Sequence, residues 1–274
     1  MKTLDRVFEN LRSNNRKALI PFFTAGYPDV PTFLALVMEA SKSGADLIEI
    51  GIPFSDPIAD GPTIQYSSAR ALKTGITLSQ TLELIKKLTE MIPTPLLVMS
   101  YLNPILKMGV DQFMKAANEA GVAGLIVPDL PVEEVGLLKS EARTVGIPLI
   151  LFLAPTSSDK RIEQVDAHAE GFIYLVSIAG VTGARDRLAG EALRLAARVR
   201  SKTTLPVCVG FGISNPEQAF CLSREADGVI IGSAIVDIIR KAGEGTAAIS
   251  QVGSFLAAVR RGIDTGNDNG NGGS

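Results

Sequence analysis

Eight short apolar segments, spread along most of the chain, constrain the fold more than any other feature of the sequence. Between them lie longer segments with apolar residues at i, i+3, i+4 and i+7, the spacing of one face of an α-helix. Strands that are apolar almost throughout and alternate with helices predict an all-parallel sheet. The predicted strands span Ala18–Thr24, Asp46–Ile52, Leu96–Tyr101, Gly124–Val127, Pro148–Phe152, Phe172–Val176, Pro206–Val209 and Gly228–Ile231.

Eight strand–helix units can form either an open doubly wound sheet or a closed barrel. An open dinucleotide-binding sheet would carry Gly-x-Gly-x-x-Gly after its first strand. No such motif follows Ala18–Thr24, and the partial match V-G-F-G-I-S begins late in the chain, at Val209. The sequence therefore predicts an α/β protein with the (β/α)8 architecture of a TIM barrel.

The two ends of the chain differ from the repeating units. Leu4, Val7, Phe8 and Leu11 have helical spacing, so we expect an extra amphipathic helix before the first strand. The last ten residues, T-G-N-D-N-G-N-G-G-S, offer no apolar side chains for burial. We therefore predict a single barrel domain over residues 1–262 and a disordered tail over residues 263–274.

Composition and charge indicate the cellular location of the protein and the kinds of partner that it is not expected to bind. Of its 274 residues 46% are hydrophobic, and its formal net charge is −2. That charge argues against a broad basic surface for nucleic acid, and no apolar run approaches the roughly 20 residues that span a bilayer. The N-terminal sequence also lacks the apolar core and cleavage site of a signal peptide. We therefore expect a cytoplasmic protein that binds neither nucleic acid nor membranes.

Cysteine and histidine are scarce, which restricts the chemistry available. Cys208 and Cys221 fall in a predicted strand and a predicted helix, and His168 is the only histidine. A disulfide framework, a zinc site and a Ser-His-Asp triad are therefore not expected, and we predict no bound metal or cofactor. Catalysis would have to use carboxylates, hydroxyls, Lys or Arg side chains, and backbone dipoles.

The second predicted strand, D-L-I-E-I-G-I, carries a carboxylate within its apolar run. Because side chains alternate across a strand, Ile48, Ile50 and Ile52 share one face, which suits packing against helices. Glu49 then points toward the barrel axis near the carboxyl end of the strand, where barrel enzymes place their chemistry. A structural ion pair is the alternative, but the long loop that follows favours function. Burial would raise the pKa of Glu49 and let it act as a general acid as well as a base.

The loop after this strand contains two more carboxylates, Asp56 and Asp60, among Pro53, Pro57 and Pro62. Proline restricts the backbone, so the loop could fold back over the mouth of the barrel. An aspartate beside glycine or proline is also typical of an ordinary turn or cap. On residue type alone, both aspartates fit that simpler role.

Glycines follow the last three predicted strands. Barrels often bind phosphate with the loops after strands seven and eight and with a helix N-terminus, where glycine lets backbone N–H groups approach the anion. Three strand ends with this character favour a phosphate site over ordinary turns. Arg185 is the only cation adjacent to them, so the site would rely mainly on backbone dipoles. The residues are Gly180, Gly183, Gly210, Gly212, Gly232 and Ser233.

Several segments resemble, in order along nearly the whole chain, the α subunit of tryptophan synthase. They include A-L-I-P-F-F-T-A-G-Y-P-D, L-I-E-I-G-I-P-F-S-D-P-I-A-D-G-P-T-I-Q, Y-L-V-S-I-A-G-V-T-G-A-R and V-G-F-G-I-S-N-P-E-Q. The resemblance implies a lyase of tryptophan biosynthesis. Such a lyase cleaves indole-3-glycerol phosphate, by a retro-aldol reaction, to indole and glyceraldehyde 3-phosphate.

The same resemblance implies roles for individual residues. Glu49 would protonate the indole ring carbon that bears the side chain and assist deprotonation of the glycerol hydroxyl. Asp60 would hold the indole N–H and stabilise the positive charge of the indolenine tautomer. The other matches are the pocket residues Phe22, Tyr174 and Phe211, the mobile-loop residues Thr182 and Gly183, and the phosphate-cradle residues Gly212, Gly232 and Ser233.

A partner is implied as well. The family's α subunit works in an α2β2 heterotetramer with a β subunit that carries pyridoxal phosphate and converts indole and serine to tryptophan. Asp56 and Asn103 lie in loops that would face that partner. Ile178 departs from the polar or basic residue common in the mobile loop, and Ile58 replaces a commoner leucine. The alternatives are a stand-alone indole-releasing lyase and a catalytically silent activator of the β subunit.

Overall fold

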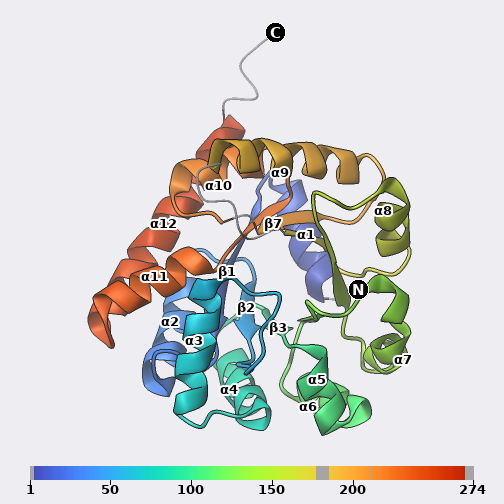
Figure 1. The fold of residues 1–274 in the computed structure, drawn as a ribbon. Coiled ribbons are helices and arrows are strands. Elements are labelled where there is room, and N and C mark those ends of the chain that lie inside the picture. The colour runs from blue at the N-terminus through green and yellow to red at the C-terminus, as the bar shows by residue number, and fades with distance from the viewer. Residues whose placement is uncertain (1–2, 177–184, 211, 269–274) are drawn as a thin grey trace.

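The centre of the molecule is a closed barrel of eight parallel strands arranged in sequence order (Figure 1). The barrel closes where the first strand pairs with the last, with Ala18 opposite Gly228. This computed structural model describes residues 3–176, 185–210 and 212–268. The predicted closed barrel is therefore confirmed. The strands are β1 (Ala18–Thr24), β2 (Ile48–Gly51), β3 (Leu96–Met99), β4 (Gly124–Ile126), β5 (Leu149–Leu153), β6 (Ile173–Val176), β7 (Val207–Gly210) and β8 (Gly228–Ile231).

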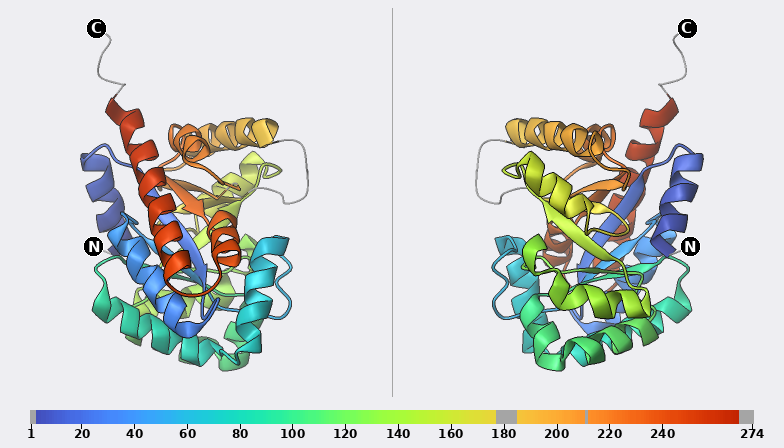
Figure 2. Two further views of the ribbon diagram at one scale, coloured as in Figure 1. Left: turned by 90° about the vertical axis from the view of Figure 1, so that its left-hand side faces the viewer. Right: turned by 90° about the vertical axis from the view of Figure 1, so that its right-hand side faces the viewer.

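Helices cover the outside of the barrel in both side views (Figure 2). Local signals define several of their starts: the Asp29 carboxylate accepts the Thr32 N–H at 2.8 Å, and Thr77 forms a capping box with Gln80. No described helix is long and apolar enough to cross a membrane. The helices are α1 (Thr3–Ser13), α2 (Val30–Lys42), α3 (Pro62–Lys73), α4 (Leu78–Met91), α5 (Leu102–Met108), α6 (Val110–Glu119), the 3-10 helix η1 (Val132–Glu134), α7 (Gly136–Val145), α8 (Asp159–Asp166), α9 (Arg185–Arg200), α10 (Pro216–Ser223), α11 (Ser233–Ala242) and α12 (Thr246–Asp268).

The core has two apolar layers, one between strands and helices and one along the barrel axis. The isoleucines of β2 and its end, Ile48, Ile50 and Ile52, pack in the outer layer, as alternation predicted. Leu47 packs in the inner layer, together with Leu4 and Phe8 of α1. The expected N-terminal helix is therefore present, and it fills the end of the barrel where the strands begin. The opposite end is left for a pocket.

The predicted start of the tail at residue 263 is wrong. Helix α12 continues to Asp268, and Ile263 is buried with 1% of its surface exposed. Arg260 explains part of this extension, because its guanidinium bonds the carboxylate of Asp264 one turn further on. Residues 269–274 lie outside the described residues.

Candidate active site

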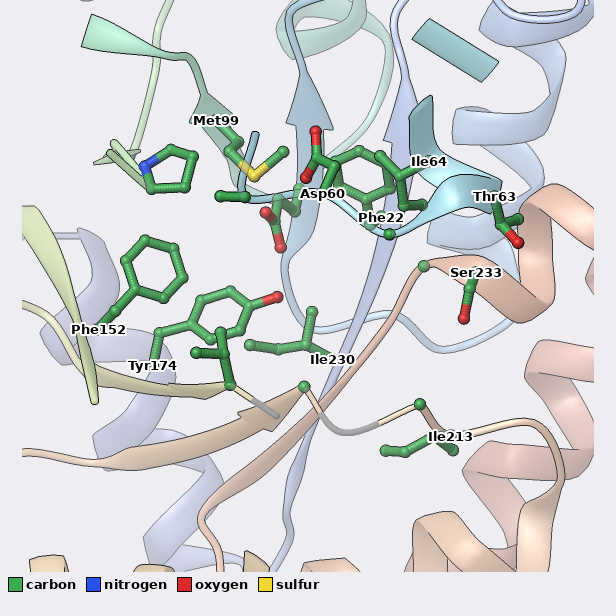
Figure 3. Close-up of a pocket in the computed structure, with 18 of the residues that line it drawn as sticks. Phe22, Asp60, Thr63, Ile64, Met99, Phe152, Tyr174, Ile213, Ile230 and Ser233 are labelled. Atoms are coloured by element: carbon green, nitrogen blue, oxygen red, sulfur yellow. The ribbon is translucent and has the colours of Figure 1, made fainter. Parts of the chain in front are cut away.

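A pocket of about 440 Å³ lies at the carboxyl ends of the strands (Figure 3). Inward-facing positions of the strands supply Phe22, Glu49, Met99, Phe152, Tyr174, Val176, Gly210 and Ile230. Loops and helix starts supply Ala59, Asp60, Gly61, Pro62, Thr63, Ile64, Pro128, Gly212, Ile213, Gly232 and Ser233. The pocket therefore occupies the place where barrel enzymes carry out their chemistry.

Glu49 lies at the bottom of this pocket, on β2, with 1% of its surface exposed. Neither of its carboxylate oxygens has a hydrogen-bond partner among the described residues. Burial, together with the nearby Asp60 carboxylate, raises the pKa of Glu49 to about 8. The Tyr174 hydroxyl opposes this shift, although the contact falls short of hydrogen-bond geometry. An unpaired buried carboxyl is costly, so Glu49 does not serve a structural ion pair.

Asp60 also lines the pocket, on the loop that leads from β2 into α3. Burial, opposed in part by the hydroxyl of Tyr101, raises its pKa to about 6. Tyr101 also accepts the Ala59 N–H at 3.0 Å, and its ring lies 5.2 Å from that of Phe54. These contacts hold the loop over the barrel mouth. The aspartate type at position 60 suggested an ordinary turn residue. The tertiary structure instead places Asp60 in the pocket together with Glu49.

The glycine-rich end of the pocket includes four of the residues predicted for the phosphate site, namely Gly210, Gly212, Gly232 and Ser233. Gly212 adopts a φ of +53°, which favours glycine, and Gly232 directly precedes Ser233, the first residue of α11. No Lys or Arg belongs to the described lining of the pocket. An anion here would therefore be held by N–H groups and hydroxyls. The predicted Gly180, Thr182, Gly183 and Phe211, and also Ile178, lie outside the described residues.

Asp56 and Asn103 are exposed and do not line the pocket. Asp56 accepts a hydrogen bond from the Ser55 hydroxyl at 2.7 Å. Ile58, on the same loop, has 83% of its surface exposed. These three residues are therefore exposed to solvent and lie outside the pocket.

Several pocket residues were missed from the sequence. Met99, Phe152 and Ile230 occupy inward positions near the carboxyl ends of β3, β5 and β8, and the alternation that identified Glu49 would have identified them too. Thr63, which lines the pocket, and Tyr101, which contacts the Asp60 loop, could not be found in this way. They lie at a helix start and beyond a strand end, where alternation does not apply.

The pocket has two chemically different ends. On the apolar side the rings of Phe152 and Tyr174 lie 4.8 Å apart, and Met99 and Pro128 lie on the same wall. On the other side are glycines and hydroxyls. Among the described residues no group of three or more His, Cys, Asp and Glu could hold a metal ion. The fold and the site are therefore those of a (β/α)8 enzyme whose pocket holds two carboxyl groups between an apolar wall and a glycine-rich end.

Comparison with known proteins narrows this class. Residues 8–260 match the family described as tryptophan synthase alpha chain, and the chain belongs to that family. The alpha chain of Citrifermentans bemidjiense is 46% identical over 263 residues, which are 96% of this chain and 98% of that one. The alpha chain of Carboxydothermus hydrogenoformans is 48% identical over 239 residues, 87% and 90% of the two chains. The solved alpha subunit of Legionella pneumophila superposes with a TM-score of 0.87 at 36% identity, covering 97% of this chain and 99% of that one.

Proposed function

We propose that the chain cleaves indole-3-glycerol phosphate to indole and glyceraldehyde 3-phosphate, as the α subunit of a tryptophan synthase. The observation that carries the proposal is the pair of carboxyl groups, Glu49 and Asp60, that share one pocket in a chain of this family. Two carboxyl groups with different pKa values can divide acid and base roles between them. The apolar wall suits an indole ring, and the glycine-rich end suits a phosphate.

The reaction requires a proton on the indole ring carbon that bears the side chain, before the bond from that carbon to the glycerol chain breaks. Glu49 has a pKa of about 8, so at neutral pH it holds the proton to be donated. Its carboxylate can then assist removal of the proton from the adjacent glycerol hydroxyl. As the carbonyl of glyceraldehyde 3-phosphate forms, the electron pair of the broken bond returns to the indole ring.

Asp60 would act on the indole nitrogen. Its pKa of about 6 leaves it largely ionised at neutral pH. As a carboxylate it can accept the indole N–H and stabilise the positive charge that protonation of the ring creates. This role needs an ionised group beside a protonated Glu49, and the order of the two pKa values supports that arrangement.

We further propose a β-subunit partner that carries pyridoxal phosphate and receives the indole within an α2β2 assembly. The exposed Asp56, Ile58 and Asn103 support a contact surface near the pocket. Release of indole from indole-3-glycerol phosphate, measured with the purified chain alone and with a β subunit, tests both proposals. A large rate increase with the β subunit supports the partnership. An unchanged rate would favour a stand-alone lyase, and no release under either condition would favour a silent activator.

The dependence of kcat/KM on pH should be bell-shaped. Because the productive state pairs a protonated Glu49 with an ionised Asp60, kcat/KM should be highest between about pH 6 and about pH 8. The two limbs report apparent pKa values of the coupled pair. In Asp60→Asn the acidic limb should disappear, and the alkaline limb should move to lower pH because the Asp60 charge no longer raises the pKa of Glu49. A wild-type kcat/KM that keeps rising well above pH 8 would contradict Glu49 as the proton donor.

Replacing Gly51 with Ala should narrow the pocket. A Cβ at Gly51 would lie 2.6 Å from two ring carbons of Phe22, so the ring must move, and overpacking of this kind costs about 1–3 kcal/mol. We expect urea unfolding to show that loss of stability and kcat/KM to fall roughly tenfold. The matched control is Gly136→Ala, because a Cβ at Gly136 would meet no atom within 4 Å. Equal behaviour of the two variants would show that Phe22 has room to move away.

A further inference from the structure

Two helices begin at the pocket without a capping side chain. The N-cap of α3 is Gly61 and the N-cap of α11 is Gly232, and both residues line the pocket. The first turn of a helix has N–H groups with no partner inside the helix, and a capping side chain ordinarily accepts one of them. Four other helices have such a side chain, namely Asp29 for α2, Thr77 for α4, Ser158 for α8 and Asn215 for α10. Helices α5, α6 and α7 also lack one, but their N-caps do not line the pocket.

The first turn of α3 has unused donors. Within the part of the chain that the structure describes, the N–H groups of Thr63 and Ile64 and the hydroxyl of Thr63 have no hydrogen-bond partner. The neighbouring Asp60 carboxylate does not accept them, since its polar contact is the hydroxyl of Tyr101. These donors are therefore available to a molecule in the pocket.

The position of these donors matches the glycine-rich end of the pocket. Figure 3 shows Thr63 and Ser233 at the same end of the pocket, and a Cβ at Gly232 would lie 3.5 Å from a side-chain carbon of Ile64, so the starts of α3 and α11 are neighbours. The buried Glu49, whose carboxylate oxygens have no partner among the described residues, independently indicates that this cavity is built for a ligand. Since no described Lys or Arg lines the pocket, an anion must be balanced by helix dipoles and N–H groups.

We propose that the first turn of α3, through the Thr63 hydroxyl and the N–H groups of Thr63 and Ile64, forms a second half of the phosphate site, facing the first turn of α11. This inference rests on the proposed function, because it concerns the phosphate of that substrate. Each helix N-terminus is equivalent to roughly half a positive charge, so two of them suit a dianion better than one. Gly61 keeps this end open, because no side chain caps α3 and a Cβ there would meet no atom within 4 Å.

Thr63→Val removes the hydroxyl and keeps the size of the side chain. The dissociation constant for glycerol 3-phosphate, measured by calorimetry, should rise about tenfold, the usual effect of one hydrogen bond to a charged group. Thr63→Ser should restore binding. In turnover of indole-3-glycerol phosphate, KM should rise in Thr63→Val with little change in kcat, because the phosphate lies away from the reacting atoms.

Gly61→Ser and Gly61→Asp provide a second test. If the first turn of α3 had only a structural role, these variants would gain stability without losing affinity for glycerol 3-phosphate. Gly61 has an extended backbone, with φ −72° and ψ 164°, so a capping side chain can take up the α3 donors. Both variants should unfold at a higher temperature than the wild type and yet bind glycerol 3-phosphate more weakly. The loss should be larger for Asp, whose carboxylate also repels the phosphate. Gly136→Asp is the charge control and should bind as the wild type does.

The outcomes separate this inference from the proposed function. If Ser233→Ala weakens glycerol 3-phosphate binding while Thr63→Val and both Gly61 variants bind within about twofold of the wild type, α3 takes no part in the phosphate site. If the wild type itself neither binds glycerol 3-phosphate nor cleaves indole-3-glycerol phosphate, the proposed function fails and this inference fails with it. Weaker binding by Thr63→Val together with rescue by Thr63→Ser supports the second half of the site.

Discussion

Glu49→Gln should lower kcat for cleavage of indole-3-glycerol phosphate by about 10²–10⁴, the usual contribution of a proton-transfer group. Gln keeps the size and polarity of the side chain but cannot donate a proton to carbon and then accept one from the hydroxyl. The dissociation constant for glycerol 3-phosphate should stay close to that of the wild type, because Glu49 lies away from the glycine-rich end. Single-turnover release of indole measures the loss. A variant that kept more than about a tenth of the activity would rule out the acid–base role.

Stability provides an independent control for Glu49→Gln. Between its ordinary pKa of 4.5 and its folded pKa of about 8, Glu49 keeps a proton that the unfolded chain releases. The free energy of unfolding contributed by this group is therefore fully present at low pH and is lost as the pH rises through that window. Glu49→Gln removes this dependence, so above pH 8 it should be at least as stable as the wild type. Loss of activity with retained stability would separate catalysis from folding.

Arg260→Met should lower the free energy of unfolding by about 3 kcal/mol, the low end of the range for breaking a buried ion pair. Arg260 is 7% exposed, and its guanidinium bonds the Asp46 carboxylate at 2.8 Å and the Lys17 carbonyl at 3.0 Å. Without it the largely buried Asp46 loses its closest cation. Arg260 thus ties α12 to the starts of β1 and β2, and its loss should loosen the whole barrel.

Two comparisons make the Arg260 prediction specific. Arg260→Met combined with Asp46→Asn should recover much of the lost stability, because no buried carboxylate then lacks a partner. Arg143→Met breaks an ion pair with Glu170 in which the arginine side chain is 62% exposed, and it should cost under about 1 kcal/mol. Urea unfolding of these three variants and the wild type measures these differences. A loss no larger for Arg260→Met than for Arg143→Met would mean that Asp46 is adequately solvated without its partner.

The barrel could be predicted because its determinants are local. Apolar strands, helical periodicity and turn residues repeat along the chain, and a parallel strand followed by a helix has few ways to continue. The boundary at residue 263 was wrong for a different reason. The segment after Arg260 is helical partly because of charge pairs with Asp264, and such contacts are not visible in a hydrophobic pattern.

The two carboxyl groups of the site differ in the same way: one could be predicted from a local pattern and the other could not. Glu49 could be found because alternation within one strand decides which way it points, and β2 turns it inward as expected. Asp60 could not be found from residue patterns alone, and only the family resemblance pointed to it, because its direction depends on a loop that Tyr101 holds in place from another part of the chain. Residue type at Asp60 is compatible with either a turn or a catalytic group.

The sequence by itself determined the strand order, the closed barrel, the inward Glu49 and the glycine-rich strand ends, since each follows from short-range periodicity. Only the tertiary structure decided which side chains share the pocket. It placed Asp60 with Glu49, Tyr101 against the Asp60 loop, and the first turns of α3 and α11 at one end of the cavity. The physical reason is that pKa values and unused donors depend on burial and on neighbours distant in sequence.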